Sequence, residues 1–286
     1  MLPRRRCTVR SREWTRAQTV CCSNVLICLL LYSFVPFSAH RAVSPALHFR
    51  LRVCWAATFL SRAGCTAWCL EKHQQAQETE TATALQFDGR VDAEGFPVAR
   101  AWGNAPAMRF RQDWQGKHAD RKRETEVRLL WTREVLYLRF LAHYRSITVF
   151  PDAEPSGRRD QLWNRDVVEV FLQPAGLNGP HYKEFEVSPN GFWIDLDIGP
   201  REKRSLQSGL RRRVQVDRQS KTWMAEMALP MKSLTAQFDP TKAWRVNFFR
   251  VEGATEPRFY SAWRPTRTTV PNFHVPEAFD TLVFET

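Results

Sequence analysis

The chain has 286 residues, of which 42 are lysine or arginine and 30 are aspartate or glutamate, so its formal net charge is +12. Residues 1–77 carry 11 basic and 2 acidic side chains, whereas residues 78–286 carry 31 and 28. Most of the excess positive charge therefore lies in the first part of the chain, and the basic pI is not evidence for a nucleic-acid partner. All seven cysteines also lie there, between Cys7 and Cys69.

The first segment, residues 1–83, has the features of an export leader. Six arginines precede a 13-residue apolar run at 25–37. A transmembrane helix needs about 20 apolar residues, whereas this run has the length of a signal-peptide core. Ser44 and Ala46 give the small-x-small pattern of a cleavage site, and residues 71–83 have the composition of a polar linker. We therefore expect export to the periplasm, the cell surface or the medium, with this leader removed or disordered.

The second segment, residues 84–286, consists of short stretches rich in β-branched and aromatic residues, separated by turn residues. Three pairs of stretches flank short turns and predict hairpins, at 125–131 with 135–143, 182–187 with 192–198, and 210–216 with 222–229. Further strands are predicted at 167–172, 244–251, 259–263 and 281–285, and one helical turn at 231–234. Strands without intervening helices predict an all-β fold, a two-layer antiparallel β-sandwich of the jelly-roll or immunoglobulin-like kind.

Alternation along these strands assigns each side chain to one face of the sheet. The apolar side chains expected to be buried are Val168, Val170, Phe185, Val187, Ile194, Leu196, Val246 and Phe248. We interpret Asp195 and Asp197 as part of a solvated outer face. Glu169 differs, because its strand is otherwise apolar on both faces. Its carboxylate is therefore expected either to be paired in the interior or to line a pocket.

The body contains no motif that identifies a catalytic site or a metal site. It has no Gly-rich phosphate loop, no G-x-S-x-G, no H-E-x-x-H and no paired C-x-x-C. Its histidines are dispersed, and its many acidic residues single out no glycosidase pair. We therefore expect a protein that is not an enzyme.

Several short motifs follow one another through the body in a fixed order. They are Phe-Asp-Gly at 87–89, Trp-Asn-Arg-Asp-Val-Val-Glu-Val-Phe at 163–171, Phe-Glu-Val-Ser-Pro-Asn-Gly at 185–191, Ser-Ala-Trp at 261–263, and Asn-Phe-His-Val-Pro at 272–276. In this order and spacing they resemble the family 9 carbohydrate-binding modules, which belong to the wider clan of DOMON-like β-sandwiches. The resemblance covers residues 84–286.

The resemblance implies that a sugar binds in a slot between two aromatic rings, where its apolar C–H face packs on the rings and its hydroxyls meet polar partners. Trp163 matches the first aromatic platform, Glu169 matches a carboxylate that accepts hydroxyl hydrogen bonds, and the second platform falls at or next to Phe273. Glu186 and Ser188 stand where sugar-binding members have arginine and asparagine. The candidate ligand-binding residues are Trp163, Glu169, Glu186, Asn247, Phe273 and His274.

The function that the resemblance implies is non-catalytic carbohydrate binding, accessory to the binding or breakdown of a polysaccharide. The expected partner is an oligosaccharide or polysaccharide, and we expect a monomer that acts alone or beside separate glycoside hydrolases, with no nucleic acid. The family often binds structural calcium, but its ligands cannot be placed here.

Two alternatives stay open. Related sandwiches hold haem b between axial ligands such as Met and His, and Met108, His143, Met224 and Met227 are available. The other alternative is an interaction scaffold without a small ligand.

Overall fold

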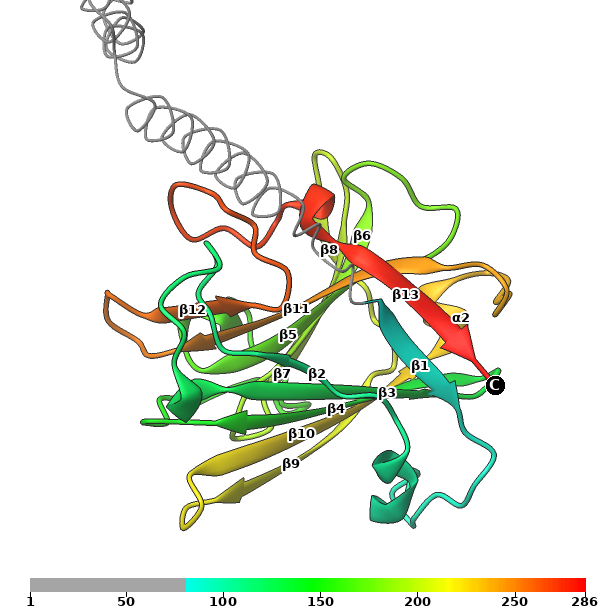
Figure 1. The fold of residues 1–286 in the computed structure, drawn as a ribbon, viewed down its shortest axis with the longest axis horizontal. Helices are drawn as coiled ribbons and strands as arrows, with labels where there is room; N and C mark the ends of the chain where they lie inside the picture. The colour runs from blue at the N-terminus through cyan, green and yellow to red at the C-terminus, as the bar shows by residue number, and fades with distance from the viewer. Residues whose placement is uncertain (1–80) are drawn as a thin grey trace, which may run out of the picture. The chain divides into compact units, whose positions relative to one another are not determined.

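The computed structural model describes residues 81–286, so the predictions made for the export leader and its cleavage site lie outside the described residues. The division of the chain at residue 83 stays a prediction. The described part is almost entirely β-structure (Figure 1), as the sequence predicts, with a single short α-helix, α2 (Met231–Leu234), at the predicted helical turn. None of the helices in this part is long and apolar enough to cross a membrane.

Thirteen strands make up the fold of residues 81–286. They are β1 (Ala82–Gln86), β2 (Met108–Phe110), β3 (Thr125–Trp131), β4 (Val135–His143), β5 (Val167–Gln173), β6 (Tyr182–Val187), β7 (Trp193–Ile198), β8 (Lys203–Ser205), β9 (Arg211–Asp217), β10 (Thr222–Pro230), β11 (Trp244–Glu252), β12 (Phe259–Ala262) and β13 (Asp280–Glu285). Four short 3-10 helices connect them in the described part: η1 (Ala99–Gly103), η2 (Arg121–Arg123), η3 (Leu162–Asn164) and η4 (Pro276–Ala278).

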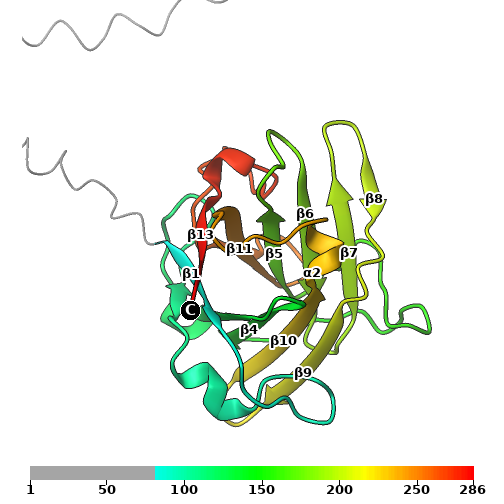
Figure 2. The same ribbon diagram turned by 90° about the vertical axis from the view of Figure 1, so that its right-hand side faces the viewer.

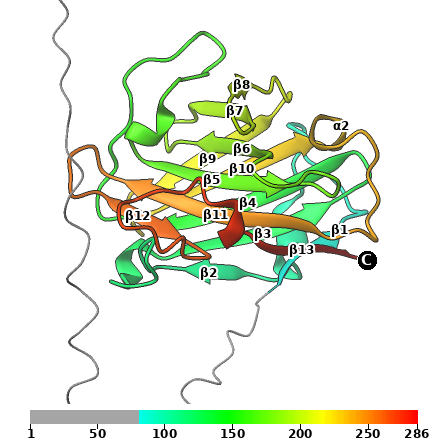
Figure 3. The ribbon, with the colours of Figure 1, turned by 90° about the horizontal axis from the view of Figure 1, so that it is seen from above.

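The strands pair in the order β8-β7-β6-β5-β11-β13-β1-β3-β4-β10-β9, and β12 and β2 add to β11 and β3. The strands from β8 to β11 lie in succession across one layer (Figure 3), and β4, β10 and β9 run across the facing layer (Figure 2). β1 pairs in parallel with both β13 and β3. The expectation of two purely antiparallel layers therefore needs one correction, because β1 and β13 join the layers into one folded sheet. This joining removes two open strand edges.

The main core lies between the two layers. Val168, Val170, Phe185 and Phe248 come from one layer. They share a cluster of buried residues with side chains of the other layer, among them Leu129, Leu138, Phe140 and Met227. All eight apolar side chains that alternation predicts as buried are buried. Two of them, Ile194 and Leu196, belong instead to a second cluster that includes Phe171, Phe249 and Phe273.

This second cluster covers the outer face of β5, β6, β7 and β11, which is therefore not a solvent-exposed surface. Because side chains alternate along a strand, Val167, Glu169 and Phe171 point away from the main core. Residues of η3 and of the segment that precedes β13 cover this face, since Leu162, Phe273 and Phe279 pack in the same cluster. The outer face is therefore a covered surface on which polar side chains are shielded from water.

The expected solvated face at Asp195 is wrong. Asp195 pairs with Phe185 across β6 and β7 and is fully buried. Its carboxylate accepts hydrogen bonds from Arg158 Nη1 at 2.8 Å and from the backbone and hydroxyl of Ser208 at 2.7 and 2.6 Å. Asp197, at the end of the same strand, is 43% exposed and lies 3.2 Å from Lys183 Nζ, as expected for a solvated position. Asp195 is buried because its register beside Phe185 directs it to the side of the sheet that faces the main core, where Arg158 and Ser208 meet its carboxylate.

Candidate functional site

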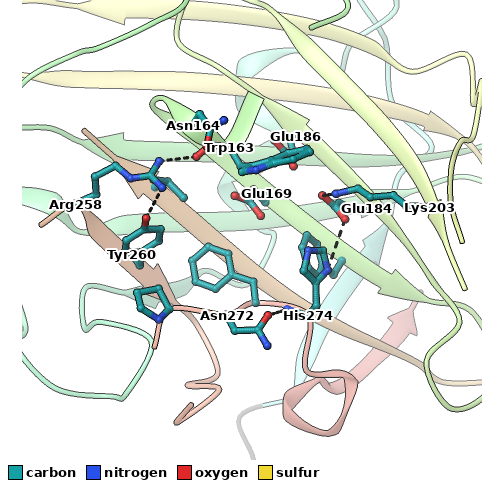
Figure 4. Close-up of a pocket in the computed structure, with 14 residues that line it drawn as sticks. Trp163, Asn164, Glu169, Glu184, Glu186, Lys203, Arg258, Tyr260, Asn272 and His274 are labelled. Atoms are coloured by element: carbon teal, nitrogen blue, oxygen red, sulfur yellow. Dashed lines mark hydrogen bonds and ion pairs between the residues drawn. The ribbon is translucent and has the colours of Figure 1, made fainter. Parts of the chain in front are cut away.

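A cavity of about 360 Å³ opens on the outer face of β5 and β6. Figure 4 shows Trp163 on one side of it, His274 and Asn272 on the other, and Glu169 between them. Lys203 of β8 and Arg258 and Tyr260, at β12, also line the cavity. The cavity therefore joins five segments that lie far apart in the sequence.

Three glutamates form the floor of this cavity. Glu169 on β5 and Glu186 on β6 are direct cross-strand partners, and Glu184 lies two residues before Glu186 and so faces the same way. Their exposed fractions are 2%, 0% and 1% for Glu169, Glu186 and Glu184. Strand alternation thus places three carboxylates side by side where almost no water reaches them.

These carboxylates lack hydrogen-bond donors from the protein. Four buried oxygen atoms have no partner in the described part of the chain, namely Oε1 of Glu169, Oε2 of Glu184 and both oxygens of Glu186. Burial raises the pKa of Glu169 and of Glu186 well above the usual range of a carboxyl, and the neighbouring carboxylates raise it further. An unpartnered buried acceptor costs free energy, so these oxygens keep an unused capacity to accept hydrogen bonds.

Trp163 forms the first wall. The 3-10 helix η3 holds it there, since Leu162 is fully buried in the cluster beneath and Arg258 Nη1 donates to the Trp163 carbonyl oxygen at 2.8 Å. The indole remains partly exposed. The ammonium of Lys203 lies 3.9 Å from the centre of its ring and 3.5 Å from Glu184 Oε1. The indole that was predicted as a sugar platform therefore lines the cavity, with the Lys203 ammonium over its ring.

The opposite wall is the loop at 271–274. Phe273 stacks on Phe249 with ring centres 4.3 Å apart and is only 8% exposed. It therefore lines the cavity from beneath. The ring at the surface of this wall is the imidazole of His274, which stacks on Phe171 with ring centres 5.4 Å apart.

His274 is held by two neighbours. Its Nδ1 is hydrogen-bonded to the Tyr182 hydroxyl and lies 3.9 Å from Glu184 Oε2. Burial lowers the pKa of His274, which favours the neutral imidazole, and burial raises the pKa of Tyr182. A neutral imidazole beside a protonated phenol makes Tyr182 the donor and Nδ1 the acceptor. The other ring nitrogen then carries the proton and can donate to a ligand.

Five of the six predicted site residues, Trp163, Glu169, Glu186, Phe273 and His274, come together around this cavity. Asn247 does not, and its prediction as a ligand contact needs correction. It is fully buried, its Nδ2 donates to the carbonyl oxygen of Arg264 at 2.9 Å, and its Oδ1 accepts from the backbone N–H of Arg264 at 3.0 Å. Its amide therefore holds the segment at Arg264 against the sheet, and both its NH₂ group and its oxygen are already used in hydrogen bonds within the protein.

Four residues with charged or hydroxyl side chains line the cavity and were not among the predicted site residues: Glu184, Lys203, Arg258 and Tyr260. Glu184 could have been predicted from the sequence, because it lies two residues before Glu186 on the same strand and therefore on the same face. The other three belong to segments whose contacts depend on how the chain folds over the sheet. Arg258 is held by Glu256, whose Oε1 lies 3.1 Å from its Nε, and by the hydroxyl of Tyr260, so its charge is largely satisfied.

The residues named for the haem alternative do not converge on one cavity in the described part. Met108 and Met227 are buried in the main core, whereas Met224 lines a different hollow on the outer face of β4 and β10. His143 is exposed at the end of β4. In residues 81–286 no group of three or more His, Cys, Asp or Glu side chains is placed to hold a metal ion, so no calcium ligands are assigned.

Comparison with known proteins gives a family match over most of the body. Residues 88–279 match the family described as "Carbohydrate family 9 binding domain-like". A relative from Arthroderma benhamiae, named "Extracellular protein", is 24% identical over 180 residues, which covers 56% of this chain and 78% of that protein.

Two solved structures share the fold. One is a putative carbohydrate-binding protein from Bacteroides uniformis, with a TM-score of 0.58 and 18% identity, covering 72% of this chain and 99% of that one. The other is a family 9 carbohydrate-binding module from Caldicellulosiruptor kristjanssonii in complex with cellotriose, with a TM-score of 0.52 and 13% identity. It covers 72% of this chain and 94% of that one.

Proposed function

The chain belongs to the family of carbohydrate family 9 binding domain-like proteins, and from this premise we propose that the cavity beside Trp163 binds a sugar unit of an oligosaccharide or polysaccharide. One observation carries the proposal. A partly exposed indole stands beside four buried carboxylate oxygens that have no donor in the described part of the protein. A sugar can supply an apolar C–H face that packs on the indole and hydroxyl donors for the oxygens.

The size of the cavity favours a small ligand. Its volume of about 360 Å³ is near the lower end of the usual range for ligand pockets. One sugar ring packed on Trp163 would reach the Glu169–Glu186 pair with its hydroxyls, and the His274 ring would bound it on the far side. This arrangement favours recognition of a chain end or a short segment of a glycan.

The proposal describes a binding protein rather than a hydrolase. In most glycosidases two carboxyl groups flank the scissile bond from different sides. Glu169 and Glu186 are adjacent cross-strand partners on one floor, so both would contact the same side of a bound sugar. Their position suits hydrogen bonding to hydroxyls and does not suit attack from opposite faces.

Export and an accessory role in polysaccharide binding or breakdown are parts of the same proposal. The extracellular relative and the arginine-rich leader with its short apolar run support export. N-terminal sequencing of protein from the native host should find a start downstream of Phe37. An intact Met1 on protein from the cytosol would contradict export.

A glycan array probed with the labelled full-length chain tests the sugar proposal. We expect retention on at least one class of glycan, and weaker retention of Glu169→Gln, because glutamine replaces one acceptor oxygen with an NH₂ group that cannot accept a hydroxyl hydrogen bond. Glu134→Gln is the matched control, since Glu134 is an exposed glutamate in the β3–β4 turn. An array without any retained glycan would leave the scaffold alternative in place of this proposal.

A further inference from the structure

We propose that the sugar selected by this cavity carries a free amine, as an unacetylated hexosamine does, with its ammonium group on the three-glutamate floor. This proposal rests on the proposed function and names the ligand class of the same site. Two independent features of the cavity carry it, the shortage of donors at the floor and the position of Lys203.

The floor has three carboxylates but few donors, and two cations, Lys203 and Arg258, line the cavity beside it. The carboxylates of Glu169, Glu184 and Glu186 share one face, and the nearest ammonium is that of Lys203, 3.5 Å from a single oxygen of Glu184. Arg258 also lines the cavity, but its guanidinium is engaged by Glu256, Tyr260 and the Trp163 carbonyl oxygen. His274 accepts at Nδ1 from Tyr182 and adds no positive charge while it is neutral.

A ligand amine supplies what the floor lacks. An ammonium group has three N–H donors, whereas each hydroxyl of a neutral sugar has one. Four oxygen atoms of this floor have no donor, and both oxygens of Glu186 are among them. A charged donor also makes a stronger hydrogen bond to a carboxylate than a neutral donor does, and the shielded position strengthens the attraction.

Lys203 shows that an ammonium fits at this position. Its Nζ lies over the centre of the Trp163 ring at 3.9 Å while it contacts Glu184, so a cation already sits between the platform and the floor. This combination of an aromatic face and a carboxylate is a favourable site for an ammonium group. Lys203 lies on β8, a three-residue strand that is exposed along its length, and its own side chain is 34% exposed. It can therefore move aside for a ligand.

The position of Lys203 predicts an effect on ligand affinity that would not be expected if Lys203 only stabilised the fold. Its charge competes with a ligand amine for Glu184 and repels that amine. Replacing Lys203 with methionine keeps an unbranched apolar chain against Trp163 and removes the charge. Lys203→Met should therefore bind an amino sugar more tightly than the parent and should gain nothing with a neutral sugar.

Isothermal titration of the full-length chain with three matched tetrasaccharides tests the proposal. β-1,4-linked oligomers of glucosamine, N-acetylglucosamine and glucose differ only at C2 of each ring. Measured at one pH for all three ligands, the glucosamine oligomer should bind at least about tenfold more tightly than the other two. Glu186→Gln should reduce that preference severalfold, Lys203→Met should increase it, and Glu134→Gln should leave it unchanged.

Three other results would contradict the amine preference, the position of the amine, or the proposed function. If the glucose or N-acetylglucosamine oligomer binds as tightly as the glucosamine oligomer, the amine preference is wrong and the proposed function stands. If glucosamine binds equally well to the parent and to Glu186→Gln, with both variants folded by melting curve, its amine does not lie on this floor and the proposal is overturned. If these oligomers fail and a glycan array also finds no ligand, the proposed function itself fails.

Discussion

Two buried glutamates, one on the outer face of each layer, have opposite surroundings. Glu226 on β10 is fully buried, and it accepts hydrogen bonds from Arg139 at 2.6 and 2.8 Å and from Arg213 Nε at 2.7 Å. Glu186 on β6 is also fully buried, yet neither of its oxygens has a donor in the described part of the chain.

The comparison of Glu226 with Glu186 shows that burial of an acidic residue does not by itself indicate a binding site. Glu226 is satisfied by arginines on the two strands beside it, so its charge stabilises the sheet. Glu186 has glutamate and isoleucine as its cross-strand neighbours, so its carboxyl group has no basic side chain beside it in the sheet. The unsatisfied acceptor is the feature that indicates a site.

The largest expected effect comes from removing the satisfied glutamate. Glu226→Ala leaves Arg139 and Arg213 facing each other without their shared acceptor. Breaking a buried pair costs about 3–5 kcal/mol, and we expect the lower end because both arginines keep some contact with water. The melting temperature should fall by roughly 6–12 °C in a thermal scan.

Glu94→Ala is the matched control for this variant. Glu94 pairs with the same Arg213 but is 64% exposed, so its removal should change the free energy of unfolding by less than about 1 kcal/mol. An equal loss in both variants would mean that burial does not distinguish the two pairs.

The second effect concerns ligand affinity at the unsatisfied site. Trp163→Ala removes the ring on which the sugar packs, and the loss should be on the order of 1–3 kcal/mol in binding free energy, by analogy with other stacking contacts. The fold should survive because Trp163 is partly exposed. Titration with the best-bound glycan measures the loss of affinity, and a melting curve shows whether the variant is still folded.

Trp193→Ala is the control, since Trp193 is another partly exposed tryptophan, and arginine rather than lysine lies over its ring, away from the cavity. It should bind like the parent. If Trp163→Ala fails to fold, Trp163 is a core residue and the platform assignment is wrong.

The third effect is a gain in stability. Glu186→Gln removes a buried carboxyl group whose ionised form has no donor and supplies an amide whose NH₂ can donate to Glu169 and Glu184. The free energy of unfolding at neutral pH should rise by about 1 kcal/mol, or roughly 2–4 °C in melting temperature. A loss of stability instead would mean that the parent carboxylate already has a partner in the protein.

The smallest effect is the pH dependence of that gain. Burial holds the pKa of Glu186 well above its usual range in the folded protein, so folding favours the protonated form. The folded parent therefore loses stability as pH rises from the unfolded pKa, about 4.3, through the raised folded pKa. A glutamine has no such loss, so the advantage of Glu186→Gln should grow between acidic and neutral pH. Melting curves at several pH values check this, and a constant difference would contradict it.

Strand alternation could be read from the sequence, and it located the main features of the site. Glu169 stood out as a lone carboxylate on an otherwise apolar strand, the family resemblance pointed to Glu186, and both lie on the cavity floor. Val168 and Val170 could be assigned to the core by the same argument. These predictions succeed because the side-chain period along a strand is fixed by local geometry.

The features that the sequence did not predict depend on contacts between distant segments. Asp195 faces the main core because β7 pairs with β6 in that register, and Arg158 and Ser208, which come from two different loops, meet its carboxylate. Lys203 reaches Trp163 only because β8 adds to the edge of β7. Loop placement of this kind has no local sequence period, and the parallel pairing of β1 with β13 joins residues at the two ends of the body for the same reason.

The most direct test of the account is a crystal structure of the full-length chain in complex with the glycan that it binds best. The account predicts one sugar ring packed on the Trp163 indole, with donors of that sugar directed at the oxygens of Glu169 and Glu186. A glycan bound elsewhere on the protein, with this cavity empty, would contradict it.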